Sequence, residues 1–409
     1  MGYGYCFNRL NRWNWVALSL MNSPLTDDWL YFYLSFKSIR YSYFSILGNP
    51  KSISLCSRGS GIVAYSPPLE HVMTKRVIFF DLLRCVAAVA VIAIHVLAPY
   101  RPMMGTIPDP QWISAVTING LSRWAVPIFI MISGALMLSD PRPFELRYYL
   151  QRRLGKVVVP FVIWSLFYAY LSGWGIRGFD LNLVKQTLLD SPHQETYYHL
   201  GFFYYFIPLY LLIPCLHWLV NRVDDGFWYS FVTIWLMTTG LYLFGIDGPW
   251  SHEIWLYSGY LPLGYLLYQK LRLSSFSLLL VVILGSFALY MTVQAVLELS
   301  LTHGRYTVGR WLSYKTLNVV AAAIMVFVLC RSLAERLPSA VQRWVVIISQ
   351  HSLGIYLLHP IFLWPMKTYA WYDGHPLWVI PLWVLLSGAG ALLTSYALSR
   401  STATRWLLP

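Results

Sequence analysis

The chain has 409 residues, of which 57% are hydrophobic and only 11% are charged, and its mean hydropathy is +0.53. Soluble domains carry about 25% charged residues, so this composition excludes an ordinary soluble enzyme, a disordered protein and a disulfide-stapled secreted domain. The net charge is +13, but the basic residues lie in short loops between apolar segments. That pattern is typical of a membrane protein and not of nucleic-acid binding.

Residues 1–72 differ in composition from the rest of the chain. They are rich in Ser, Tyr, Asn and Arg, and their longest apolar run, 15–21, is too short to cross a bilayer. Arg9 and Arg12 precede that run as in a signal peptide, but no small-residue cleavage site follows cleanly. We expect translation to begin at Met73, with 1–72 as a non-native upstream extension or a disordered leader.

From Val77 onward the chain contains apolar segments long enough to cross a bilayer. Ten such segments are expected, at 77–99, 119–139, 156–175, 202–220, 227–245, 254–270, 275–297, 313–331, 347–366 and 377–398. The sequence therefore predicts an all-α, polytopic membrane bundle of about ten transmembrane helices within residues 73–409.

The distribution of positive charge predicts the orientation of this bundle. If the first segment begins in the cytoplasm, fifteen Lys and Arg residues lie in inner loops and seven lie in outer loops or at outer helix ends. Inner loops carry the excess of positive charge in membrane proteins. Both termini are thus expected in the cytoplasm.

The first segment carries three ionisable residues, Asp81, Arg84 and His95. Ionisable residues inside a membrane helix are costly and are functional candidates. The eleven-residue step from Arg84 to His95 returns to within about 20° of the same helix face, and Asp81 lies about 60° away. The three form a polar stripe. The alternative is an Asp–Arg ion pair at the helix mouth with a hydrogen-bonded core histidine.

The second and third segments carry further signals. Pro127 is expected to kink the second helix, and Ser133-Gly134 permits close approach of a neighbouring backbone. The loop before the third segment is strongly basic, which fits either a positive-inside anchor or a clamp for phosphate oxygens. The basic residues of this loop are Arg142, Arg147, Arg152, Arg153 and Lys156.

The ninth segment carries Ser352, Tyr356 and His359 at spacings i, i+4 and i+7, which places them on one helix face. Pro360 follows directly and frees a carbonyl one turn back. Such a polar stripe exceeds what packing requires and indicates function. Several other polar residues near the outer helix ends fit either an acceptor site or a simple interfacial position: His199, His252, His303 and Lys315.

Motifs for other chemistries are missing from the sequence. It contains no Walker loop, no GxSxG elbow and no HExxH pair, and its five cysteines show no CxxC spacing. We therefore expect no metal site and no disulfide framework.

Four stretches in order resemble the acyltransferase 3 family of bacterial membrane acyltransferases, over about residues 76–400. Phe80-Asp-Leu-Leu-Arg84 with His95 is similar to the family's first-helix signature, and Val126–Gly134 is similar to its second-helix motif. The basic run before Pro160 and the stretch Ser352–His359 are similar to its third-helix and late-helix motifs. The stretch His199-Leu-Gly-Phe-Phe-Tyr most resembles the branch that O-acetylates the enterobacterial common antigen.

Two positions depart from the family pattern. The third-helix Arg-x-x-Arg reads Arg153-Leu-Gly-Lys156, which replaces a guanidinium fork with a point charge. The Leu-Trp that commonly follows the fourth-helix histidine reads Leu200-Gly201, which puts a stacking role there in doubt.

The resemblance implies transfer of an acetyl group from cytoplasmic acetyl-CoA to a hydroxyl of an envelope glycan or a lipid-linked sugar. The implied donor site is Arg152, Arg153 and Lys156. His95 would accept the proton of the attacking hydroxyl, Arg84 would hold the donor and Asp81 would orient Arg84. The acceptor side is formed by Ser352, Tyr356, His359 and His199. Direct transfer and an acyl-histidine intermediate both remain open.

The resemblance also implies a multi-pass protein of the bacterial inner membrane, in contact with the lipid bilayer and with glycan assembly proteins. Two alternatives fit the same polar residues. A proton-coupled secondary transporter or exporter of a glycolipid or sugar would use intramembrane Asp, Arg and His, although no two-fold repeat is visible. A structural subunit of a glycan assembly complex would need no donor site.

Overall fold

The computed structural model describes residues 77–176, 178–404 and 406–408, which belong to one compact unit, Thr74–Pro409. The expected leader over 1–72 and the expected start at Met73 lie outside the described residues. The unit is built from helices and one two-stranded hairpin. Its first half comprises α2 Ile78–Val96, η1 Ala98–Met103, α3 Asp109–Ser122, α4 Ala125–Leu138, α5 Leu146–Tyr149, the π turn η2 Leu150–Leu154, α6 Gly155–Ser172, β1 Trp174–Gly175, β2 Gly178–Phe179 and α7 Leu181–Asp190.

The second half of the unit is entirely helical. It comprises α8 Gly201–Val220, α9 Asp225–Leu243, η3 Pro249–Ser251, α10 Glu253–Ser258, α11 Tyr260–Tyr265, the π turn η4 Leu266–Lys270, α12 Ser275–His303, α13 Leu317–Leu333, η5 Ala334–Arg336, α14 Ser339–Gln350, α15 Ser352–Thr368 and α16 Pro376–Arg400. The prediction of an all-α, multi-pass bundle is confirmed.

The number of membrane-spanning helices is smaller than ten by length and composition. Seven helices of the described residues are long and apolar enough, or eight when α14 and α15, bent by 73°, are taken as one span. The other two expected segments, 227–245 and 254–270, are helical but fall short. The first, α9, carries Ser and Thr residues along its length, and the second is divided at Gly259 into α10 and α11.

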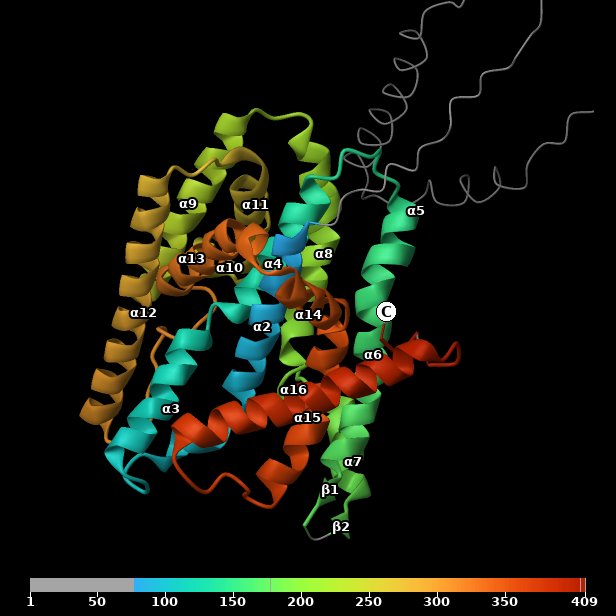
Figure 1. Cartoon of the computed structure of the whole chain (residues 1–409), viewed down its shortest axis with the longest axis vertical. Coiled ribbons are helices and arrows are strands. Elements are labelled where there is room, and N and C mark those ends of the chain that lie inside the picture. The colour runs from blue at the N-terminus through green and yellow to red at the C-terminus, as the bar shows by residue number, and fades with distance from the viewer. Residues whose placement is uncertain (1–76, 177, 405, 409) are drawn as a thin grey trace, which may run out of the picture. The chain divides into compact units, whose positions relative to one another are not determined.

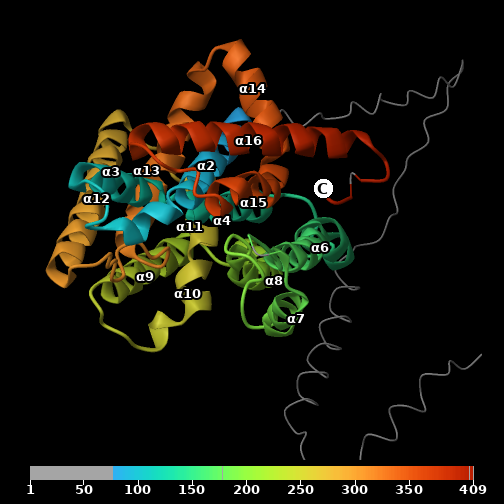
Figure 2. The same ribbon diagram turned by 90° about the horizontal axis from the view of Figure 1, so that it is seen from below.

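Figures 1 and 2 show how the unit is layered around α2 and α4. Helix α2 contacts α3, α4, α13, α14, α15 and α16. Helices α6 and α8 lie on one side of this centre and α12 lies on the other, while α16 crosses the remaining spans steeply in both views. We call the two ends of the bundle the Ile78 end, where α2 begins, and the Val96 end, where α2 ends.

Close packing of α4 on α11 fixes the centre of the bundle. A Cβ added to Gly134 would lie 2.1 Å from the carbonyl oxygen of Leu261, and one added to Gly264 would lie 2.1 Å from that of Met131. Only glycine permits this approach of two backbones. The predicted role of the Ser133-Gly134 step is therefore confirmed.

The second expected helix breaks earlier than its proline. Helix α3 ends at Ser122 and α4 begins at Ala125, so the break falls at Arg123–Trp124. Pro127 lacks an N–H and its ring crowds the carbonyl four residues back, which is that of Arg123. The proline thus acts one turn upstream of its own position.

Most of the basic segment before the third span is helical, and only Arg142 lies in the loop that precedes it. Residues Leu146–Ser172 form one 27-residue helical stretch with a π turn at Leu150–Leu154. No Pro or Gly interrupts residues 146–154, and Leu, Arg and Gln favour helix. A π turn shifts the helical phase between residues on either side of it, so faces assigned from a regular α-helix do not hold here.

Candidate active site

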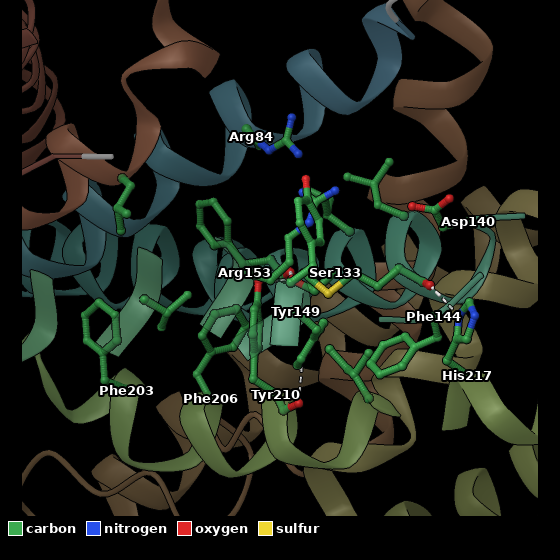
Figure 3. Close-up of a pocket in the computed structure, with 18 of the residues that line it drawn as sticks. Arg84, Ser133, Asp140, Phe144, Tyr149, Arg153, Phe203, Phe206, Tyr210 and His217 are labelled. Carbon is green, nitrogen blue, oxygen red and sulfur yellow. Dashed lines mark hydrogen bonds between the residues drawn. The ribbon is translucent and has the colours of Figure 1, made fainter. Parts of the chain in front are cut away.

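A cavity of about 590 Å³ lies between α2, α4, η2, α6, α8 and α15 (Figure 3). Most of its wall is apolar or aromatic. Figure 3 shows Arg84 pointing from α2 into the cavity, opposite Phe203, Phe206 and Tyr210 of α8. A pocket of this size with a few convergent polar groups is a typical small-molecule site.

Arg84 is held from behind by residues outside the cavity. Its Nη1 lies 3.7 Å from the carboxylate of Asp81. The same carboxylate accepts a hydrogen bond of 2.6 Å from the hydroxyl of Ser349 on α14. Asp81 is 2% exposed and Arg84 is half-buried. The ion pair therefore ties the cavity arginine to a third helix.

Only part of the predicted donor clamp faces the cavity. All three residues are exposed, but only Arg153 contributes to the cavity lining. The π turn that contains Arg153 and ends before Lys156 changes the phase between them. Arg142 also lines the cavity, paired with Asp140 at 2.5 Å. The structure thus brings together Arg84 and Arg153, from separate helices.

Three histidines from distant segments meet in the Val96 half of the bundle. The ring centroids of His95 and His359 are 5.3 Å apart, and those of His199 and His359 are 5.7 Å apart. His199 and His359 are buried, at 2% and 0% exposure, while His95 is half-buried. Tyr198 completes this group, which we call the histidine cluster, with its ring 4.8 Å from that of His95.

Pro360 determines which ring nitrogen of His359 carries the hydrogen. Because proline has no N–H, the carbonyl of Tyr356 loses its helical donor. His359 Nδ1 lies 2.7 Å from that carbonyl oxygen and 3.2 Å from that of Ile355. A carbonyl only accepts, so Nδ1 carries the hydrogen. Nε2 then presents a lone pair in the neutral ring, buried and without a hydrogen-bond partner among the described residues.

Other polar atoms of the histidine cluster also lack partners within the described part of the chain. Both ring nitrogens of His199 and the hydroxyl of Tyr198 are buried without a hydrogen bond. Burial, followed by the neighbouring His359, lowers the pKa of His199 well below its ordinary value. The imidazole is therefore neutral at neutral pH. Buried polar groups without partners are rare, so these atoms are candidates for contact with a substrate.

Tyr356 joins the cavity to the histidine cluster. Its side chain lines the cavity, together with Ser352 one turn earlier. Its hydroxyl donates to the backbone carbonyl of His199, and its ring lies 5.6 Å from the His199 ring. A molecule that enters at Arg153 and passes along the cavity would therefore reach the side of the cluster.

Sequence reasoning missed Lys367 and Tyr198. The ammonium of Lys367 lies 3.6 Å from the Tyr198 ring centroid, next to the histidines. A signal was present, because Lys367 follows Tyr356 by eleven residues, the same step that joins Arg84 to His95. Tyr198 precedes α8 in a turn and has no helical periodicity to reveal it.

The structure also bears on metal binding. Among residues 77–176, 178–404 and 406–408, no group of three His, Cys, Asp or Glu side chains is placed to hold a metal ion.

Comparison with known families gives one match. The acyltransferase 3 family model, described as an acyltransferase domain, matches residues 77–400. No curated protein and no solved structure matches the chain.

Proposed function

The chain belongs to the acyltransferase 3 family and is a membrane acyltransferase, and on this premise we propose that it transfers an acetyl group from acetyl-CoA to a hydroxyl of an envelope glycan or lipid-linked sugar. The observation that carries the proposal is the contact, through Tyr356, between a cavity lined by three arginines and the histidine cluster.

The donor is proposed to enter from the Ile78 end, taken as cytoplasmic from the positive-inside prediction. Arg153 at the cavity mouth and Arg84 deeper inside suit an anionic CoA head, since guanidinium groups bind phosphate oxygens in two-point fashion. The apolar and aromatic wall suits the extended thiol arm. Asp81 holds Arg84 in place through the ion pair and the hydrogen bond to Ser349.

The chemistry is proposed to occur at the histidine cluster. A neutral His95 ring nitrogen accepts the proton of the acceptor hydroxyl as its oxygen attacks the thioester carbonyl. The carbon–sulfur bond then breaks, and CoA leaves as the thiolate, which takes up the proton. His359 and His199 would line the acceptor side, whereas Ser352, also expected there from the sequence, lines the donor cavity. The alternative is an acyl-histidine intermediate. A histidine nitrogen would attack the thioester and CoA would leave as the thiolate. The acceptor hydroxyl would then take the acetyl group as the carbon–nitrogen bond breaks and would give up its proton to the released histidine or thiolate.

The acceptor is proposed to be a glycan of the bacterial inner membrane, where glycan assembly proteins would supply it. The similarity around His199-Leu-Gly-Phe-Phe-Tyr favours the enterobacterial common antigen as one such acceptor. The family match favours acyl transfer over the rival assignment, a secondary transporter.

The test is transfer of labelled acetyl from acetyl-CoA in membranes that contain the protein, followed by mass analysis of the envelope glycans. We expect one or more added acetyl groups on a glycan, lost when the protein is absent. Transport of a glycolipid without any consumption of acetyl-CoA would support the transporter instead.

A further inference from the structure

Three half-buried cations at the Val96 end differ from their neighbours Arg310 and Lys315. Arg310 pairs with Asp247 at 2.6 Å, and Lys315 pairs with Glu253 at 2.8 Å. Arg101, Arg123 and Lys367 form no ion pair with an Asp or Glu side chain among the described residues. All three are half-buried. Arg310 and Lys315 are thus neutralised by carboxylates, and Arg101, Arg123 and Lys367 are not.

The contacts of these three cations are with neutral groups. Arg101 donates to the carbonyl of Ile94 at 2.9 Å, and Arg123 donates to the hydroxyl of Tyr314 at 3.1 Å. The Nε of each arginine is buried without a hydrogen-bond partner in the described residues. Lys367 lies over the ring of Tyr198. Each cation therefore keeps hydrogen-bond donors that the described part of the chain does not use.

The three cations are linked through Arg101, and two of them act on the proposed reaction centre. The charges of Lys367 and Arg101 both act on His95, and that of Arg101 acts on Lys367. Burial, followed by the charge of Arg123, lowers the pKa of Arg101. Holding like charges together at low exposure costs free energy. An anion placed among them would remove that cost.

Arg101 also reaches a second pocket at this end of the bundle. Arg101 lines a second pocket of about 380 Å³ with Arg305 and Tyr306, and its lining includes no acidic residue. This pocket is separate from the donor cavity, whose lining contains none of the three cations. A ligand of Arg101 would therefore approach from the side opposite to the donor.

We infer that Arg101, Arg123 and Lys367 hold an anionic group of the acceptor, a carboxylate or a phosphate next to the sugar that is acylated. The inference rests on the proposed function and narrows its substrate to charged glycans. Tyr198, which contacts both Lys367 and His95, lies between the anion site and the base. The unpartnered nitrogens of His199 and His359 are then available for sugar hydroxyls.

The experiment measures binding to the full-length purified protein in a neutral detergent. The probes are methyl glucuronide, glucose 1-phosphate and the uncharged methyl glucoside at equal ionic strength. We expect at least one charged sugar to bind about tenfold or more tightly than the neutral one, since each charged contact is a strong one. The tighter of the two identifies carboxylate or phosphate.

The variants are Lys367→Met and Arg101→Gln, with Arg310→Gln as the matched control from a paired cation. The first two should lose the preference, whereas Arg310→Gln and Lys367→Arg should keep it. Unchanged CoA binding shows that each variant is folded. Equal binding of charged and neutral sugars, or loss of preference in Arg310→Gln as well, would overturn the inference.

Acetyl transfer to the same probes separates this inference from the proposed function. Transfer without preference for a charged acceptor would overturn the anion site and leave the function intact. Preferential binding of charged sugars without acetyl transfer would support the anion site and contradict the function.

Discussion

Two prolines do the same thing to the backbone in two regions of the bundle, with opposite results. In α8, Pro214 leaves the carbonyl of Tyr210 without its helical donor, and the hydroxyl of Tyr149 supplies a hydrogen bond of 2.7 Å. In α15, Pro360 frees the carbonyl of Tyr356, and His359 supplies the donor at 2.7 Å.

The difference lies in the hydrogen-bonding capacity that each side chain keeps after it has donated to the freed carbonyl. The Tyr149 hydroxyl uses its only proton, so the cavity wall becomes a closed hydrogen-bonded scaffold that joins α5 to α8. The imidazole of His359 uses one nitrogen and leaves a lone pair on the other. The comparison teaches that the wall uses its hydrogen-bonding capacity on its own backbone, whereas the cluster keeps part of it unused, as the proposed chemistry requires. Variants of the cluster should therefore impair transfer, and variants of the wall should impair stability.

The largest expected effect comes from the cluster. His95→Ala should lower acetyl transfer by about 100-fold or more, the typical contribution of a positioned base. The matched control is His303→Ala, because His303 is an exposed histidine on α12. The measurement is labelled acetyl transfer in membranes at equal expression. Near-normal transfer by a folded His95→Ala protein would refute the assigned role.

The second prediction compares Arg153, which lines the proposed donor cavity, with Lys156, which does not. Arg153→Ala should raise the apparent KM for acetyl-CoA by about tenfold, since one charge-assisted contact contributes roughly 1.5–3 kcal/mol. Lys156→Ala should change it much less because Lys156 does not line the cavity. An acetyl-CoA titration of both variants decides the point. Equal effects would restore the paired clamp expected from the sequence.

The cluster should also respond to acid. Because burial lowers the pKa of folded His199, only the unfolded chain takes up this proton below about pH 6.5. Stability is full above that pH and falls as the pH drops toward the folded pKa, by up to about 1.4 kcal/mol per pH unit. In thermal unfolding between pH 5 and 7, His199→Phe should remove this contribution, so that the free energy of unfolding declines less steeply as the pH falls. An identical pH profile would argue against a neutral buried His199.

A variant of the cavity wall should lower stability and leave acetyl transfer nearly unchanged. Tyr149→Phe leaves the buried carbonyl of Tyr210 without its side-chain donor, which should lower stability by about 1–3 kcal/mol. The kcat for transfer should stay close to normal because no proton is moved there. Thermal unfolding and transfer kinetics on the same sample test both halves. A large fall in kcat at unchanged stability would place Tyr149 in the chemistry.

The smallest effect should come from Pro360, which fixes the tautomer of His359 on the proposed acceptor side. Pro360→Ala restores a backbone N–H that competes with His359 for the Tyr356 carbonyl. The ring then divides between tautomers, and transfer should fall by roughly two- to tenfold, the worth of one hydrogen bond. Nitrogen NMR of labelled histidine, read against transfer, distinguishes this from a packing defect. A single Nδ1–H tautomer in the variant would disprove the proline's role.

The sequence could predict the features that depend on local pattern. Apolar segments gave the all-α bundle, and the Ser133-Gly134 step marked a close backbone approach that Leu261 completes. Helical periodicity placed His95 and His359 on polar faces. Their proximity could not be predicted, because they are 264 residues apart in the chain and meet only through packing between helices. The same is true of His199 and His359. The π turn at Leu150–Leu154 could not be anticipated because it has no strong residue signature.

The bend of 73° between α14 and α15 has a mechanical consequence. Helix α14 exposes Val341, Trp344 and Ile347, yet its Ser349 holds the carboxylate behind Arg84 at 2.6 Å. A displacement of α14 by only about 1 Å would lengthen this bond past hydrogen-bonding distance. A tilt of α14 would therefore break the hydrogen bond from Ser349 to Asp81 and so loosen the support of Arg84 inside the cavity.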